Sequence, residues 1–380
     1  MLISLRFICE ANFILTYMNM NSHFNIFVAN PTLSFADQLQ DLRNSVQLWF
    51  GSYNCSPSNL LFSRVYLTDS ANQLSFFLSH SLFSDCLSFG AISYVEQPLI
   101  GGAKVAVQAW IVDAGSILKK GTPEKMEIKI GDSVIFFFQS VRFKELEVDG
   151  KNACVQTEMA FQRHIDWLEE NGLRLKNNCH RTWLYVRDVD RNYADVVRGR
   201  NNVFENEGLT KDTHFIASTG IGGASEDCHA LVGVDFFSVD GISSDCIRYL
   251  QALDFLNPTS EYGVAFERGT ALDLPFGHFR FISGTASIDK YGICLYRGDI
   301  QAQTERMFLN VSKLLEADGS TLSDIAYMVV YLRDIADYMW VKKYLSLHFP
   351  DVPSLLVEAR VCRPEWLIEV ECIAVTHNEE

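Results

Sequence analysis

Apolar and polar positions follow the same order in three parts of the chain. Residues 35–50 carry apolar side chains near the 3.6-residue period of a helix, at Leu39, Leu42, Val46 and Trp49. A polar linker follows, and then the run LLFSRVYLTD, which ends at Asp69 and is typical of a buried strand. The last third repeats this order, with a predicted helix over residues 304–316, a turn, and the strand IAYMVVYLRD, which ends at Asp334.

The middle third contains another copy, whose YVRD segment ends at Asp188. Each copy closes on an apolar strand, at residues 103–112, 230–239 and 366–375. A further strand precedes each helix, near Ile26, near Phe136 and over residues 279–288. Strands and helices in this order form an α+β unit with helices on one face of a mixed sheet. We therefore predict three such units, over residues 22–125, 126–243 and 244–380.

The closing strands differ in one respect that bears on chemistry. Only the last one carries two carboxylates, Glu369 and Glu371, which point to the same face because strand side chains alternate. The equivalent positions are Gly233 and Asp235 in the middle copy and Ala106 and Gln108 in the first. A charge on an apolar strand is costly unless it lines a site or has a partner, and a solvated strand edge is the other interpretation. If the units pack around a pseudo-threefold axis, three equivalent clefts form between them. We expect only one of these clefts to carry the side chains that a reaction needs.

Composition excludes several classes of function. The chain has 380 residues, a net charge of −15 and no basic run, which disfavours a nucleic-acid surface. Its ten cysteines form no CxxC pair and indicate reduced intracellular thiols. Two Cys-His pairs, at residues 179–180 and 228–229, lack second partners at zinc spacing, so we predict no metal and no organic cofactor.

The N-terminal residues 1–19 are apolar enough to suggest a signal peptide. Arg6 and Glu10 interrupt them, however, and no small-residue cleavage site follows. Met18 and Met20 allow a simpler interpretation, in which the natural protein starts further downstream. No apolar run approaches the roughly 18 residues that a membrane span needs, so we expect a cytoplasmic protein without membrane contact.

Several segments resemble a known family. The stretch that begins FISGTASID and continues through YRGDIQAQTERMFLNVSKLLEADGSTLSDIAYMVVYLRD resembles the Rid/YjgF family, whose small subunits form trimers with ligand sites at subunit interfaces. A single chain with three such units, RNYADVVRGRNNVF in the middle copy and VCRPEWLIEVE near the end, resembles the chorismatases. These enzymes hydrolyse or rearrange chorismate and release pyruvate. The resemblance covers residues 130–375 and implies a pseudo-trimer, with the first third as a degenerate copy.

The resemblance implies a role for particular residues. Glu369 matches the catalytic acid of the family. Two arginines match positions that bind the substrate carboxylates, and an aromatic residue matches one that lines the same cleft. A Thr-Gly pair matches a turn that closes over this cleft. A cysteine matches a cleft position that varies between branches of the family. These residues are Arg363 and Arg200, Tyr193, Thr219 and Gly220, and Cys362. A cysteine at this position implies the branch that forms 3-hydroxybenzoate rather than a dihydroxycyclohexadiene carboxylate. Departures from the family pattern are Val196-Val197 and the segment 289–296.

The residues themselves support part of this chemistry. Cleavage of an enol ether requires a neutral carboxylic acid and cationic groups for a dicarboxylate substrate. Glu369 lies between Ile368 and Val370 and shares a face with Glu371, so desolvation and a like charge are expected to raise its pKa. Arg200 lies in a charged helix, and on composition alone it is a solvated residue. Arg268 is a further candidate anion ligand, although a surface pair with Glu267 is an equal alternative.

Two other functions remain open. A Rid-type deaminase of enamines or imines is one, although its carboxylate-binding arginine would stand two residues after Pro353, where this chain has Leu355. A non-catalytic small-molecule-binding protein on the same fold is the other. In each case the expected partner is a small anionic molecule, with the chain acting as a monomeric pseudo-trimer or as a weak homo-oligomer.

Overall fold

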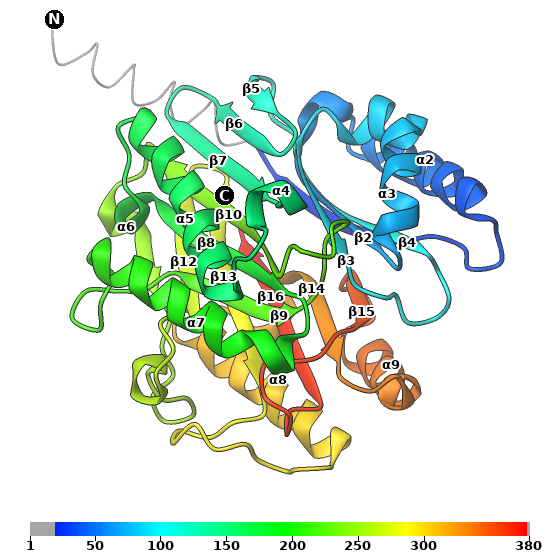
Figure 1. Cartoon of the computed structure of the whole chain (residues 1–380). Helices are drawn as coiled ribbons and strands as arrows, with labels where there is room; N and C mark the ends of the chain where they lie inside the picture. The colour runs from blue at the N-terminus through cyan, green and yellow to red at the C-terminus, as the bar shows by residue number, and fades with distance from the viewer. Residues whose placement is uncertain (1–19, 378–380) are drawn as a thin grey trace, which may run out of the picture.

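The computed structural model describes residues 20–377, so the expectations about residues 1–19 lie outside the described part of the chain. Three mixed sheets surround a common centre, and their helices lie on the outside of the molecule (Figure 1). No helix within residues 20–377 has the length and apolar character that crossing a membrane requires. The predicted class, an α+β chain of three units arranged as a pseudo-trimer, is confirmed.

The first unit has four strands in the order β1-β4-β2-β3 and two helices. Helix α2 begins after Ser34, whose side chain accepts a hydrogen bond from the backbone N–H of Asp37 at 3.2 Å. Its four predicted apolar positions are all buried against the sheet. The elements are β1 Ser22–Val28, α2 Phe35–Ser52, β2 Leu60–Leu67, α3 Ser70–Ser79, β3 Ala91–Glu96 and β4 Val105–Val112.

The second unit has six strands in the order β5-β6-β7-β10-β8-β9. The predicted boundary between residues 125 and 126 falls inside the β5–β6 hairpin, so β5 belongs to this sheet rather than to the first. The strands are β5 Ile117–Thr122, β6 Lys125–Ile130, β7 Val134–Val141, β8 Cys179–Val186, β9 Ala217–Gly222 and β10 Val232–Asp240. The helices are α4 Glu145–Val148, α5 Ala153–Glu170, α6 Leu175–Asn178 and α7 Val189–Asn206.

The third unit repeats the second, with the strand order β11-β12-β13-β16-β14-β15. Helix α8 begins earlier than predicted because the Asp299 side chain accepts hydrogen bonds from the N–H groups of Gln301 and Ala302, at 3.0 Å each. The strands are β11 Ile247–Tyr249, β12 Gly269–Leu274, β13 Gly277–Ala286, β14 Ile325–Leu332, β15 Ser354–Glu358 and β16 Ile368–Thr376, and the helices are α8 Ile300–Glu316 and α9 Tyr338–His348.

The strand registers agree with the alignment of the three closing strands. A Tyr-x-x-Asp sequence, which we call the YxxD segment, spans the end of each of the strands β2, β8 and β14. Its tyrosine lies opposite the aligned residue of the closing strand in every unit. The pairs are Tyr66 with Ala106, Tyr185 with Gly233, and Tyr331 with Glu369. The aspartates of these segments lie beyond the strand ends, where Asp69 caps α3 through a hydrogen bond from the N–H of Asn72. The three copies are therefore structurally equivalent residue by residue at this position.

One sequence-based expectation about the site is wrong. Thr219 and Gly220 do not form a turn but lie in strand β9, where they pair in parallel with Trp183 and Leu184 of β8. The turn was what the family resemblance implied. Pairing with β8 satisfies the backbone groups of the segment in an extended conformation instead.

The inner faces of the three sheets meet in an aromatic cluster. Trp110 of the first sheet lies 5.6 Å from Phe136 of the second and 5.6 Å from Phe279 of the third, between ring centroids. Phe237 and Phe281 join the second and third sheets at 5.2 Å. Because helices cover one face and this cluster covers the other, the central strands are buried on both sides, which explains their nearly continuous apolar runs.

Replacing Trp110 by alanine is expected to destabilise all three units together, because the indole contacts the other two sheets. The free energy of unfolding should fall by about 3–5 kcal/mol, measured by urea titration with a single transition. Leu48→Ala, which truncates a side chain that is 76% exposed, is the control and should change it by less than about 0.5 kcal/mol. Independent melting of one unit in the Trp110 variant would contradict a shared core.

Candidate active site

A cavity of about 220 Å³ lies between the second and third units. The second unit contributes α7 and β9, and the third contributes β13, β16 and the loops before β12 and before β16. Six of the seven site residues named from the sequence line it, namely Glu369, Arg363, Arg200, Tyr193, Gly220 and Cys362. The structure thus brings together side chains that are up to 176 positions apart, from 193 to 369, in one cleft.

The carboxyl group of Glu369 is buried in the wall of this cavity and is only 3% exposed as a residue. Burial raises the pKa of Glu369 from 4.5 to about 8, and the nearby negative charge of Glu371 adds to this, while Arg181 and Arg268 oppose it. A carboxyl group with this pKa is mostly protonated at neutral pH. It can therefore donate a proton to a molecule bound in the cavity.

A β-bulge makes room for this carboxyl group. The pairing of β13 with β16 shifts register between Ile282 and Thr285, and Gly284 lies in the shifted segment. A Cβ atom at Gly284 would overlap Oε1 of Glu369, so any other residue there would displace the carboxyl group. In the same segment Ser283 accepts a hydrogen bond from the N–H of Ser218 at 2.8 Å, which joins the second unit to the third beside the site.

Glu371, two residues further along β16, does not line the cavity. Its carboxylate accepts hydrogen bonds from Nη2 of Arg181 at 2.7 Å and from Nε1 of Trp183 at 2.9 Å. Nη1 of Arg64, from the first unit, lies 3.9 Å away. The two carboxylates share a strand face as predicted, but one has cationic partners and the other faces the cavity.

Three guanidinium groups surround the cavity. Arg363 donates a hydrogen bond to the carbonyl oxygen of Gly292 at 2.9 Å, and its guanidinium carbon lies 4.9 Å from the Trp366 ring centroid. Arg200 is buried, which overturns the alternative that it is a solvated residue. Its guanidinium lies over Phe266 at 5.9 Å. The positive charges are thus held against aromatic rings in the walls of the cavity.

Arg268 is the third of these groups. It donates to the carbonyl oxygen of Asn257 at 3.1 Å and lies 5.3 Å from the Phe266 ring centroid. The alternative that it forms a surface pair with Glu267 is wrong, because both side chains are buried. Glu267 instead accepts a hydrogen bond from the N–H of Phe215 at 2.8 Å.

Tyr193, Gly220 and Cys362 form one wall. A Cβ atom at Gly220 would lie 2.9 Å from Cε2 of Tyr193, so the glycine lets the phenol ring pack directly on β9. Burial raises the pKa of Tyr193, and the neighbouring Cys362 thiol adds to this. The phenol therefore stays neutral near the site.

Thr219 lies behind the cavity wall rather than in it. Its Oγ1 accepts hydrogen bonds from Nη2 of Arg181 at 2.6 Å and from the N–H of Gly284 at 3.0 Å. It thereby connects the arginine that binds Glu371 to the glycine that packs on Glu369. Thr219 is fully buried and is not among the residues that line the cavity.

Sequence reasoning missed part of the site. Trp366, Phe266 and Gly284 line the cavity, and two of them lie in segments that carry the family resemblance, Trp366 in VCRPEW and Gly284 in FISGTASID. The segment 289–296, noted as unusual, supplies the carbonyl oxygen that binds Arg363. Val196 does not form a pocket wall but packs in the core of the second unit.

The cleft between the first and second units is closed. In this cleft Gly233 occupies the position equivalent to Glu369. The Arg142 side chain fills the space beside it, and its Cδ lies 3.0 Å from where a Cβ atom of Gly233 would be. Arg142 forms an ion pair with Asp235 at 2.9 Å and donates hydrogen bonds to Ser93 Oγ and to the carbonyl oxygen of Tyr94, at 3.0 Å each. This cleft therefore has no room for a ligand at the equivalent position.

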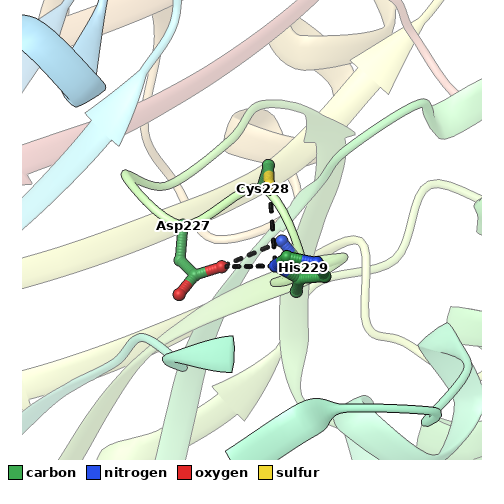
Figure 2. A group of neighbouring side chains, drawn as sticks. All are labelled: Asp227, Cys228 and His229. Atoms are coloured by element: carbon green, nitrogen blue, oxygen red, sulfur yellow. Dashed lines mark hydrogen bonds and ion pairs between the residues drawn. The ribbon is translucent and has the colours of Figure 1, made fainter. Parts of the chain in front are cut away.

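One group of side chains outside the cavity has the residue types of a metal site. Asp227, Cys228 and His229 follow one another in the loop between β9 and β10 and point toward one another (Figure 2). The carboxylate of Asp227 already accepts hydrogen bonds from the N–H groups of Glu145 and His229, at 2.7 and 2.9 Å. These bonds hold the loop in place, and a metal would have to compete with them.

The raised pKa of Glu369 makes folding stability depend on pH. Between about pH 5 and pH 8 the folded protein keeps a proton that the unfolded chain has lost, so stability should fall with rising pH by up to about 1.4 kcal/mol per pH unit. Glu369→Gln removes this dependence and should be more stable than the unchanged protein at pH 8. Urea unfolding at several pH values measures it, with the exposed Glu358→Gln as the control. Parallel curves for all three proteins would show that Glu369 ionises normally.

Comparisons with known proteins give three findings. Residues 271–376 match the family described as Endoribonuclease L-PSP. RutC family proteins from Pyrococcus abyssi and Pyrococcus horikoshii are each 34% identical over 100 residues, which is 26% of this chain and 79% of each relative. A crystal structure of a chorismatase matches with a TM-score of 0.64 and 17% identity, over 83% of this chain and 93% of that one.

These findings agree on architecture. A relative in the RutC family corresponds in length to a part of this chain that is the size of one unit. The chorismatase structure, at its low identity, shows that the whole arrangement of three units occurs in another protein. The chain therefore belongs to the RutC family and combines three units of the Rid/YjgF-like fold.

Proposed function

We propose that the protein is a chorismatase-like enzyme that cleaves the enol ether of chorismate, or of a closely related dicarboxylate, and releases pyruvate. The observation that carries the proposal is a carboxyl group with a pKa of about 8 that faces a cavity with guanidinium groups in its walls. An anionic substrate and an acid that stays protonated are the two things this reaction needs. The shared fold with a chorismatase supports the same reading.

Glu369 acts as the general acid. It donates its proton to the terminal methylene carbon of the enol ether, which forms a C–H bond and leaves an oxocarbenium ion. Water or the ring hydroxyl then adds to the cationic carbon and returns a proton to Glu369. With water, the resulting hemiketal breaks its C–O bond to give pyruvate and a ring alcohol; with the ring hydroxyl, a cyclic ketal forms, which breaks down to pyruvate and the aromatic product. A positioned acid of this kind contributes about 10²–10⁴-fold in rate.

The arginines bind the substrate carboxylates. A guanidinium group donates two parallel hydrogen bonds to a carboxylate, which fixes the orientation of the substrate as well as its charge. Arg363 and Arg200 come from different units and are assigned the two carboxylates, with Arg268 beside the acid. The Phe266 and Trp366 rings hold these guanidinium groups in place.

The ring product depends on how the cation is captured. Cys362 lies in the cavity wall beside Tyr193. Burial raises the pKa of its thiol, so the thiol remains neutral next to the ring of a bound substrate. Capture by the ring hydroxyl leads to 3-hydroxybenzoate, whereas capture by water leads to the dihydroxycyclohexadiene carboxylate. We favour 3-hydroxybenzoate, and mass spectrometry of the product identifies it.

Glu369→Gln is expected to lower the rate of pyruvate release by about 10²–10⁴-fold, because glutamine cannot donate the proton. A coupled lactate dehydrogenase assay with chorismate measures this, and Glu358→Gln, on the exposed side of β15, should retain full activity. Ammonia release from an imino acid without turnover of chorismate would replace the proposal by a deaminase. Thermal stabilisation by an aromatic carboxylate without any turnover would indicate a binding protein instead.

The pH dependence should report the same acid. Glu369 must be protonated to react, so kcat/KM for pyruvate release should be constant below a pKa of about 8 and fall tenfold for each further pH unit. Initial rates at low chorismate concentration across about pH 6 to pH 10 measure it. A rate that rises through this range would mean that an unprotonated base carries the reaction.

A further inference from the structure

The third unit forms a cleft with the first that is equivalent to the candidate active cavity. Leu356 pairs with Val330 as Gly220 pairs with Leu184, so β15 takes the place of β9. Isolated bridges join Val357 to Leu99 and Ile221 to Val361, which puts the loop at Leu99 in the position of the loop at Val361. Helix α9 takes the place of α7 (Figure 1).

Three polar residues of the active cavity, Glu369, Cys362 and Arg363, have apolar or small counterparts in this cleft. Ala106 stands in the slot of Glu369, as the strand registers show. Counting from the bridges, Ile100 corresponds to Cys362 and Gly101 to Arg363. Leu345 lies on the helix that replaces the one carrying Arg200. This cleft therefore lies at the same place in the fold as the active cavity but lacks its acid, its cysteine and the arginine at position 363.

Like the active cavity, this cleft is open rather than filled by side chains. It holds a cavity of about 310 Å³, whereas the cleft between the first and second units is filled by Arg142. Most of the residues that line it are apolar, and five of these are buried: Leu99, Ile100, Leu345, Phe349 and Leu355. We name it the apolar cleft.

A single charge marks the apolar cleft. Lys342 is the one charged residue among the described residues that line it, and its ammonium group lies 5.4 Å from the centroid of the Tyr338 ring at the same wall. Lys342 is exposed, so the charge lies at the mouth while the apolar walls lie deeper. This arrangement complements a molecule with an apolar body and an anionic end.

We propose that the apolar cleft binds a small molecule with a hydrocarbon body and one carboxylate group, with the body between the leucine side chains and the carboxylate at Lys342. The volume suits a small ligand, since it is somewhat larger than that of the candidate active cavity. An unfilled apolar cavity forfeits dispersion contacts, which a hydrocarbon body restores. The proposal stands on the cleft between the first and third units and does not depend on the reaction proposed for the other cavity.

Octanoate, hexanoate and 1-octanol are the probes, titrated into the full chain by calorimetry. Octanoate should bind about tenfold more tightly than hexanoate, because each added methylene group contributes about threefold to fourfold when it is buried. It should also bind about two- to fivefold more tightly than 1-octanol, which lacks the charge. Equal affinities for the three probes, or no octanoate binding at millimolar concentration, would overturn the proposal.

Two variants locate the binding. Ser346→Trp places an indole at the mouth of the cleft, from an exposed position on α9, and should weaken octanoate binding at least tenfold. Lys342→Gln should weaken it about two- to fivefold and leave 1-octanol unaffected, while the neighbouring exposed Lys343→Gln, outside the cleft, should change neither. Circular dichroism verifies that each variant folds.

Two outcomes would overturn the assignment. Octanoate binding that survives Ser346→Trp would place the ligand elsewhere, for example among the arginines of the other cavity. A chain that sediments as a dimer, and becomes a monomer on Ser346→Trp, would show that a second copy covers the apolar cleft instead of a small molecule.

Discussion

The ion pairs at the centre of the molecule are the constraint on which the candidate site depends. Arg64 of the first unit contacts Asp235 of the second at 3.1 Å, and Arg181 of the second contacts Glu371 of the third at 2.7 Å. All four side chains are almost completely buried, where an uncompensated charge would be very unfavourable. These pairs join the three units in one network and hold a carboxylate beside Glu369. Glu369 can then remain buried as a neutral carboxyl group.

Fusion of three units in one chain allows their clefts to differ. In a homotrimer the three clefts are identical by symmetry, so a change in one is a change in all. Here one cleft is filled by Arg142, one is lined by arginines and an acid, and one is apolar. The backbone frame is the same in each, since the tyrosine of the YxxD segment faces the same slot in all three units. Divergence has therefore acted on side chains that point into the clefts, while the strands that carry them are retained.

Glycine has a specific part in this divergence. Gly284 and Gly220 leave room for the Glu369 carboxyl group and for the Tyr193 ring. At the corresponding slot of the first-to-second cleft, Gly233 leaves room for Arg142 instead. The absence of a side chain on one strand thus decides which side chain of a neighbouring segment occupies the cleft. A single strand pattern can in this way produce either an open cavity or a closed one.

The sequence by itself determined the repeat, the order of strands and helices, and the two carboxylates of β16, because these follow from periodicity along the chain. It also identified Glu369 as the residue whose environment would favour the neutral form. Only the tertiary structure decided that Arg200 and Arg268 are buried beside the cavity, that Thr219 lies behind its wall, and that Glu371 is engaged by Arg181. These features depend on which unit packs against which, and contacts between segments far apart leave no periodic signal in the sequence. The contrast between the three clefts has the same origin, since a cleft exists only once two units meet.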